Sequence, residues 1–359
     1  MVRGRIYQVY KPKSRGGNEM SKQQQKIFFI GSVLLILMFG LVTFALAAEK
    51  SYTLRFNTVA APTMPQVLAM EKFGEVVGAL SGGKIKVKVF HSGQLGDQKT
   101  ALLGIMKGTL EMASDASPSF FADLANYPDV AVLEGAYLYR DIDHAYRVLT
   151  GPIARNHWEN IAKKANLRVL DSWYLGTRQL NLTKKAGVVR RPEDLKGIKL
   201  RMPNVESYLD MGRALGGQPT PLGFGEVYMA LKTGTIDGQD NPLPTDLAAK
   251  FVEVTHYIVL TDHMICFINP VINDKLWRSM PEDYRVYIKQ AMLVARFFMN
   301  EMVMEQEAKL LGKFIKDYGM EIIVPNKGAF MDHAKKFYSQ EKFNKRWGTG
   351  RYSQIQSMD

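Results

Sequence analysis

Five side chains suited to holding an organic anion occur between residues 178 and 241 of this sequence. They are Arg178, Arg201, Asn204, Phe224 and Asn241. A guanidinium group is planar, stays charged at physiological pH and can match a carboxylate through two parallel hydrogen bonds. Each of the five stands at the edge of an expected strand or helix, and loops at strand ends bind ligands in open α/β sheets. The same spacing is compatible with arginines in surface salt bridges, which contribute little energy.

Motifs for catalysis or for holding a metal or nucleotide are weak. The six histidines form no i, i+4 pair and have no acidic partner at metal-site spacing, so we expect no metal site. Gly78–Lys84 resembles a phosphate-binding loop, but Ile85 replaces the hydroxyl residue that would hold magnesium, and the segment follows a helix. Gly223-Phe224-Gly225 lacks the third glycine of a dinucleotide fingerprint. We therefore expect no cofactor.

Alternating strand and helix patterns are expected to position the candidate residues. The first run predicts strands at Tyr52–Thr58, Lys84–Val89 and Leu110–Ala113 and helices at Pro65–Leu80 and Asp97–Lys107. The second run predicts strands at Arg168–Trp173, Gln179–Leu182, Lys199–Met202 and Ile236–Gln239 and helices at Val205–Leu215 and Phe224–Thr233. Such alternation is typical of mostly parallel sheets covered by helices. The sequence therefore predicts an α/β fold with two units.

A long helical pattern follows the second unit. It opens at Ser279 and Pro281 and keeps one apolar face to about Lys313. At 1.5 Å per residue it would extend about 45 Å, which is more than one small domain needs. We expect this helix to run across both units and tie them together.

The first 47 residues are typical of a secretory signal peptide. Lys22 and Lys26 precede an uncharged stretch that reaches about Leu46, and Ala45-Leu46-Ala47 offers small residues at the cleavage positions. The apolar stretch is also long enough for an uncleaved membrane anchor. Met20 would make a more ordinary start, in which case residues 1–19 are not translated. In each case the folded domain is expected to work outside the cytoplasm, in the periplasm.

Charge and cysteine content exclude some classes of protein. The formal net charge is +12, but residues 1–47 carry seven basic residues and one acid, so half of this charge belongs to the leader. The rest has no run of lysine and arginine interleaved with aromatics, so we expect no nucleic-acid partner. Cys266 is the single cysteine, so the chain forms no internal disulfide.

Several segments carry a specific resemblance to a known family. They are Leu195–Asn204 (LKGIKLRMPN), Pro219–Tyr228 (PTPLGFGEVY), Thr235–Pro242 (TIDGQDNP), Ser92–Asp97 (SGQLGD) and Gly176–Gln179 (GTRQ). The sequence resembles the extracytoplasmic solute receptors of tripartite ATP-independent periplasmic (TRAP) transporters, of the dicarboxylate- and sialic-acid-binding type. The resemblance extends over about residues 50–355.

This resemblance implies a two-lobed α/β fold of the periplasmic-binding-protein kind, with a cleft between the lobes and a long helix spanning them. The first lobe would comprise residues 48–175 and about 267–305. The second lobe would comprise residues 176–266 and about 306–359. The lobes would close on an organic acid in the cleft.

The resemblance also implies a role for each candidate residue. Arg201 takes the place of the arginine that grips the ligand carboxylate, and Arg178 that of a second arginine beside it. Asn241 matches an asparagine that hydrogen-bonds the same carboxylate. Phe224 matches an aromatic residue packed on the ligand body, and Asn204 a nearby polar pocket residue.

Four further positions bear on the ligand. Gln98 and Ala116 stand where sialic-acid-binding members have carboxylates, so sialic acid is not expected. A smaller monocarboxylate, such as a hydroxy acid, keto acid or sugar acid, fits better, and Gln98 is included in the expected site. Trp173 and Tyr174 would either add an apolar wall to the pocket or serve as core aromatics at a strand end.

We therefore expect an exported, monomeric solute-binding protein that is not an enzyme. It would deliver a small organic acid to ion-gradient-driven TRAP membrane subunits. One alternative is a sensor that hands the closed complex to a signalling receptor, because the binding physics is the same. Another is an exported hydrolase or lyase that uses Asp237 or Asp240 as its base. Asp262 and His263, near an expected crossing between the lobes, are further candidates for the pocket wall.

Overall fold

The computed structural model of the chain describes residues 21, 23, 26 and 50–358. Contacts along the chain separate residues 1–50 from a folded unit of residues 51–359. The expected signal peptide and the expected start at Met20 lie almost wholly outside the described residues. Within the described part of the chain, no helix is both long enough and apolar enough to cross a bilayer.

The strands form two parallel groups joined by long antiparallel strands. The strands are β1 (Tyr52–Asn57), β2 (Ile85–Phe90), β3 (Met112–Ala116), β4 (Leu167–Val169), β5 (Trp173–Leu182), β6 (Lys199–Met202), β7 (Gln218–Pro221), β8 (Gly238–Pro242), β9 (Tyr257–Asn273) and β10 (Glu321–Ile323). Their order is β2-β1-β3-β9-β5-β8-β6-β7, and β4 and β10 also pair with β9. Pairing within β1–β3 and within β6–β8 is parallel, which confirms the predicted alternation.

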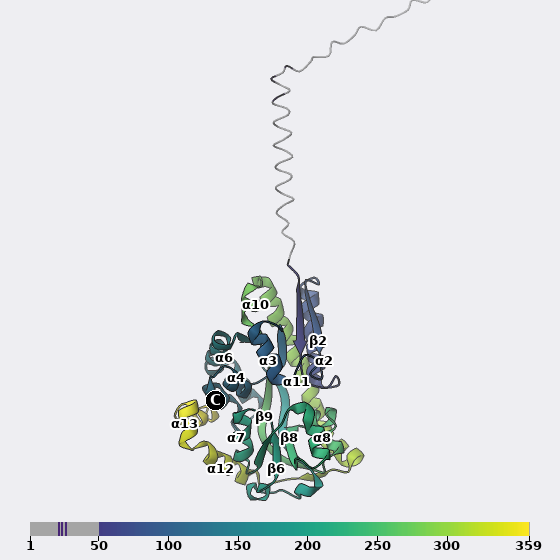
Figure 1. Cartoon of the computed structure of the whole chain (residues 1–359), viewed down its shortest axis with the longest axis vertical. Helices are drawn as coiled ribbons and strands as arrows, with labels where there is room; N and C mark the ends of the chain where they lie inside the picture. The colour runs from purple at the N-terminus through teal and green to yellow at the C-terminus, as the bar shows by residue number, and fades with distance from the viewer. Residues whose placement is uncertain (1–20, 22, 24–25, 27–49, 359) are drawn as a thin grey trace, which may run out of the picture. The chain divides into compact units, whose positions relative to one another are not determined.

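Helices cover both groups of strands. They are α2 (Pro65–Leu80), α3 (Gln98–Lys107), α4 (Pro118–Leu124), α5 (Ile142–Thr150), α6 (Pro152–Ala165), α7 (Glu206–Ala214), α8 (Val227–Lys232), α9 (Leu243–Ala248), α10 (Asp274–Ser279), α11 (Glu282–Tyr318), α12 (Lys327–Tyr338), α13 (Glu341–Trp347) and α14 (Arg351–Gln356). Short 3-10 helices are η1 (Pro128–Glu134), η2 (Lys184–Ala186), η3 (Pro192–Leu195), η4 (Phe224–Glu226) and η5 (Phe251–Glu253). In Figure 1, α2, α3 and α10 lie with β2 in the upper lobe, whereas α7, α8 and α12 lie with β6 and β8 in the lower lobe.

The strands β5 and β9 and one helix connect the lobes. The C-terminal residues of β9 pair with β3 and β4, while its N-terminal residues pair with β5 and β10. Helix α11 packs on α2 of the first lobe and on α9 and β10 of the second. Its 37 residues extend about 55 Å at 1.5 Å per residue. The prediction of a helix that spans both lobes is confirmed, although the helix continues beyond Lys313 to its left-handed cap at Gly319.

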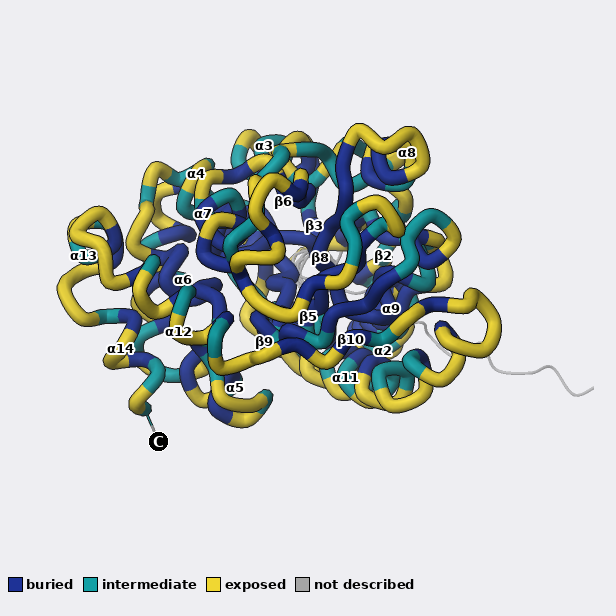
Figure 2. Tube along the Cα trace, turned by 90° about the horizontal axis from the view of Figure 1, so that it is seen from below, coloured by how far each residue is buried: buried dark blue, intermediate teal, exposed yellow. Residues whose placement is uncertain are grey.

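Local sequence signals account for the first helices. Helix α2 begins at a proline and buries Val67, Met70, Phe73 and Val77, which recur at helical spacing. Helix α3 begins after Asp97, whose carboxylate accepts a hydrogen bond from the Thr100 amide at 2.7 Å. Buried strands at the centre and helices with exposed outer faces are visible in Figure 2.

The bounds predicted for the two strands between Arg168 and Leu182 need correction. The structure has a short β4 and one continuous β5 that begins at Trp173. No break separates Trp173 from Gln179, because β5 pairs along most of its length with β9, which lies more than 70 residues later in the sequence. Shifts of register at Tyr174/Gly176 and Arg178/Leu180 accommodate the crossing. A local pattern contains no information about such a distant partner.

Gly176 is the position in β5 that only glycine can occupy without strain. Its φ is +122°, and a Cβ atom there would lie 2.6 Å from the Cβ of Pro242. We expect Gly176→Ala to lower the free energy of unfolding by about 2–4 kcal/mol. The cost of a positive φ in alanine and the cost of the clash with Pro242 are added together. Gly187→Ala is the matched control, since its φ is +75° but nothing lies within 4 Å. Urea unfolding that gave equal losses for the two variants would contradict this reason.

The exact lobe boundaries stay a prediction. Asn300 and Glu307 of α11 accept hydrogen bonds from the backbone of Tyr174 and Thr177, close to the expected changes of lobe. Helix α14, which the prediction assigns to the second lobe, packs on residues 136–144 of the first. There the Tyr352 hydroxyl donates to the carbonyl of Ala136. The C-terminal segment thus contacts both expected lobes.

Candidate ligand-binding site

A cavity lies between the lobes, where the carboxyl ends of parallel strands from both sides meet. It encloses about 590 Å³, including space open to solvent. From the first lobe it is lined by residues that follow β1 and end β3, and by Gln98 at the start of α3. From the second lobe it is lined by Arg201 of β6, Asn241 of β8 and Phe224, which follows β7. The candidate residues Arg201, Asn241 and Phe224 thus line one cavity at the ends of strands, and their role in binding stays a prediction.

A second hollow of about 890 Å³ adjoins this cavity. The two share Gln98, Arg201 and Phe224, and the outer hollow adds Asn204. Asn204 is exposed, whereas Arg201 is buried. The structure therefore brings Asn204 to the entrance of the cavity, while the other three reach its interior.

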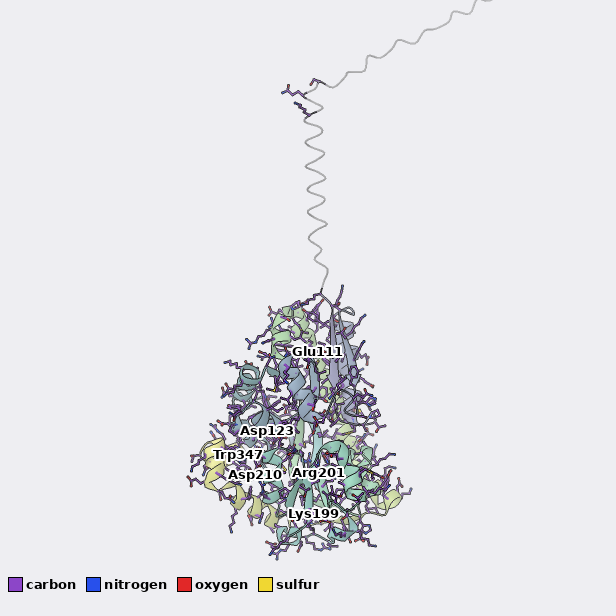
Figure 3. The ribbon with its side chains drawn as sticks, in the orientation of Figure 1. Glu111, Asp123, Lys199, Arg201, Asp210 and Trp347 are labelled. Carbon is purple, nitrogen blue, oxygen red and sulfur yellow. The ribbon has the colours of Figure 1, made fainter. Side chains whose placement is uncertain are left out.

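Arg201 brings to the cavity a positive charge that has no direct ion pair among the described residues. Its side chain is 2% exposed, and its Nε donates to the carbonyl of Leu222 at 3.0 Å. Among the described residues its two terminal amino groups have no hydrogen-bond partner. Burial and the neighbouring charge of Arg178 lower the pKa of Arg201 to about 10, so the group is still charged at neutral pH. Figure 3 shows Arg201 within the lower lobe, with Lys199 of the same strand nearer the edge.

Arg178 also lines the cavity, but its charge is already neutralised. Its Nε donates to Oδ2 of Asp240 at 2.6 Å, and its Nη2 lies 3.1 Å from Oδ1. His263 adds a contact of 3.0 Å from Nε2 to Oδ2. Burial opposes ionisation of Asp240, but the charge of Arg178 and these hydrogen bonds outweigh it and hold the pKa of Asp240 well below its usual range. The pairing of Arg178 with Asp240 was not predicted from the sequence.

The first lobe contributes a carboxyl group that the sequence analysis missed. Asp115 accepts hydrogen bonds from the Thr58 hydroxyl at 2.9 Å, the backbone amide of Val59 at 2.9 Å and the side-chain amide of Gln66 at 2.6 Å. Burial raises the pKa of Asp115 despite these bonds. A carboxyl group and amide in this place suit hydroxyl groups of a ligand. The available signal was the single charged residue within the otherwise small and apolar β3, next to Ala116.

Tyr208 of α7 is another wall residue that the sequence analysis missed. Its ring lies 5.4 Å from the guanidinium carbon of Arg178, and its hydroxyl donates to Glu134 at 2.9 Å. It lies in a helix with an ordinary apolar spacing, so no local signal distinguished it from a core residue.

The inclusion of Trp173 in the site needs correction. Its ring is fully buried, packs edge-on against Phe56 at 6.4 Å between centroids, and does not line the cavity. Tyr174 is likewise buried, and its hydroxyl donates to Glu307 at 2.7 Å. Both are core aromatics at the start of β5. Leu175, the next residue, is the one that reaches the cavity.

The two candidate bases, Asp237 and Asp240, and the candidate wall residues Asp262 and His263 do not line this cavity. Asp237 is held by Lys185 at 2.8 Å and by the amide of Lys199 at 3.0 Å, at the start of β8 and away from the cavity. Asp240 is bound to Arg178 and His263, so it has no free basic oxygen for a substrate. Asp262 lines a different hollow beside Lys327.

Comparison with known proteins agrees with this geometry. The family described as "Bacterial extracellular solute-binding protein, family 7" matches residues 56–345. The 2,3-diketo-L-gulonate-binding periplasmic protein of Escherichia coli is 30% identical over 294 residues, which are 82% of this chain and 88% of that protein. These matches extend over the cavity residues of both lobes.

Two solved structures of TRAP periplasmic solute-binding proteins from Roseobacter denitrificans are also similar. One, with bound 3-deoxy-D-manno-oct-2-ulosonic acid, has a TM-score of 0.80 and 31% identity and covers 86% of this chain and 99% of its own. The other, with bound L-galactonate, has a TM-score of 0.76 and 31% identity and covers 83% and 98%. The chain therefore belongs to the family 7 bacterial extracellular solute-binding proteins, the family of the TRAP periplasmic receptors, whose members bind solutes and are not enzymes.

Proposed function

We propose that this protein captures a sugar acid or a similar small hydroxylated monocarboxylate between its lobes. Arg201 would pair through its two terminal amino groups with the ligand carboxylate, and Asn241 would hydrogen-bond the same group. Gln98 and Asp115 would meet hydroxyl groups of the ligand body, and Phe224 would pack against its carbon chain. Arg178, already paired, would act as a rigid wall beside the carboxylate.

The observation that carries the proposal is the unpaired guanidinium of Arg201. A buried charge without a partner is costly, and the cost is recovered when an anion of the right shape fills the cavity. The polar groups of the first lobe add a preference for hydroxyl-bearing ligands. The relatives described above bind 2,3-diketo-L-gulonate, 3-deoxy-D-manno-oct-2-ulosonic acid and L-galactonate, which all combine a carboxylate with a polar chain.

The mechanism would be hinged capture, with the lobes divided as the sequence predicts. The acid enters the open cleft and pairs with Arg201 of the second lobe. Closure of the first lobe excludes water and strengthens each charged hydrogen bond, since the local dielectric falls. The ligand stabilises the closed form only by its differential affinity for that form.

The proposal extends to location and partners. A cleavable signal peptide would export the chain to the periplasm, where it would act as a monomer. The closed form would deliver its ligand to the membrane subunits of a TRAP transporter, which draw on an ion gradient. This part is supported by membership of the family and by the apolar stretch before Ala47.

Ligand identification tests the proposal directly. Mass spectrometry of small molecules released from the purified, denatured protein is expected to show a carboxylate. A thermal-shift panel follows, with L-galactonate, 3-deoxy-D-manno-oct-2-ulosonic acid, succinate, sialic acid and the neutral sugar galactose. We expect a hydroxylated monocarboxylate to raise the melting temperature, because a ligand that binds only the folded state stabilises it. Stabilisation by galactose with no effect of any acid would refute the proposal.

A further inference from the structure

Asn241 is connected to a buried carboxyl group that does not touch the cavity. Its Nδ2 donates to Oε1 of Gln239 at 2.5 Å, and Nε2 of Gln239 donates to Oδ1 of Asp246 at 2.8 Å. Asn241 is 4% exposed, and the other two are fully buried. Asp246 belongs to α9, the helix that follows β8 directly. The three side chains form a relay from the inside of the second lobe to the cavity wall.

The inner end of this relay, Asp246, has few neighbours that would stabilise a negative charge. Oδ2 of Asp246 has no hydrogen-bond partner among the described residues, and neither has the adjacent Thr245 hydroxyl. Burial and the charge of Asp240 on β8 disfavour ionisation of Asp246, while Gln239 and the charge of Arg178 on β5 favour it. Burial prevails, so the pKa of Asp246 lies well above its usual range. Helix α11 and η5 also pack on α9, and in the described part of the chain they add no charge that acts on this carboxyl.

An ionised Asp246 fixes the direction of both amides, whereas a protonated Asp246 also allows the opposite direction. An ionised carboxylate only accepts, so Gln239 must turn its NH₂ group toward Asp246 and its oxygen toward Asn241. Asn241 must then donate one N–H to Gln239, which leaves its second N–H and its oxygen without a partner among the described residues. A protonated Asp246 can donate to Oε1 of Gln239 instead. Gln239 then donates to Asn241, and the whole NH₂ group of Asn241 becomes available to the ligand.

We propose that Asp246 is a positioning residue that decides, through Gln239, whether Asn241 presents a donor or an acceptor beside Arg201. The inference rests on the proposed function, because only an anionic ligand needs the donor. The proton-bearing relay suits a carboxylate better than the ionised relay, because it frees both N–H groups of Asn241 and turns the oxygen of Asn241 away from the anion. Binding of the acid and protonation of Asp246 are therefore coupled: each favours the other.

The first test is the affinity for L-galactonate between pH 5 and pH 9, by calorimetry. In the wild type we expect the affinity to fall by about tenfold as pH rises through the raised pKa, since one hydrogen bond to a charged group is lost. Asp246→Asn keeps the shape and supplies a permanent donor, so its affinity should stay high and flat. Gln239→Leu removes the relay without touching Asp246 and should also give a flat profile.

A matched control separates the relay from general titration. Asp171 is another buried carboxyl, and burial raises its pKa to about 6, but it pairs with Arg296 and does not line the cavity. Asp171→Asn should keep the pH profile of the wild type. Equal profiles for the wild type and Asp246→Asn would overturn the inference.

A second test needs no ligand and so distinguishes failure of the relay from failure of the proposed function. Side-chain amide resonances of Asn241 and Gln239 are followed by NMR through a pH titration of the ligand-free protein. We expect both to shift together with protonation of Asp246 in the wild type and to stay constant in Asp246→Asn. Resonances that do not shift with protonation of Asp246 would overturn the relay even if an acid binds. Coupled resonances with no acid bound would leave the relay intact and reject the proposed ligand class.

Discussion

Replacing Arg201 by alanine is expected to lower the affinity for a sugar acid at least about thirtyfold. Removing one partner of a buried charge pair costs about 2–5 kcal/mol of binding, because the other charge is left buried and unpaired. Arg201→Lys should also bind more weakly, since an ammonium group lacks the planar fork. Calorimetry with L-galactonate measures both. The ligand-free Arg201→Ala variant should stay folded, because the charge that it removes forms no direct ion pair with any residue that the structure describes.

Arg190→Ala is the matched control for this prediction. Arg190 is an exposed arginine of the same lobe and does not line the cavity. Arg190→Ala and Arg201→Ala change the net charge equally. An affinity that falls in both variants would therefore indicate long-range attraction of the anion rather than a direct contact with Arg201. Wild-type affinity in Arg201→Ala would remove the central observation behind the proposed function.

Replacing Asp240 by asparagine is expected to cost about 3–5 kcal/mol of the free energy of unfolding. The change leaves the guanidinium of Arg178 buried without its counter-charge and leaves one acceptor oxygen for both Arg178 and His263. Thermal or urea unfolding measures the loss. Glu206→Gln is the control, because Glu206 forms an exposed pair with Arg213 and should cost less than about 1 kcal/mol.

The pH dependence of the Asp240 pair has a definite sign. The pKa of Asp240 is held below that of an unfolded aspartate, which is about 3.9. The pair therefore contributes its full stability above about pH 4 and loses it as pH falls toward the folded pKa. The wild type and Asp240→Asn should converge in stability only in strong acid. A constant difference down to pH 2 would contradict the ion pair.

Much of the fold was predictable because its signals are local. The helical patterns at Pro65–Leu80 and Asp97–Lys107 and the long apolar face after Pro281 each predicted an element that the structure contains. The crossing of β5 and β9 was not predictable, because their pairing joins residues far apart in sequence. The local pattern even placed a break between Trp173 and Gln179, where β5 continues.

The same division holds within the site. The sequence by itself determined the family, the α/β class, the lobe-spanning helix and the group of residues at strand ends, since residue types and short motifs record these directly. Only the tertiary structure decided that Arg178 is neutralised by Asp240 while Arg201 is left unpaired, that Trp173 belongs to the core, and that Asp246 is linked to Asn241. The physical reason is that a charge is defined by what surrounds it, and burial and partners come from segments that only the folded chain brings together.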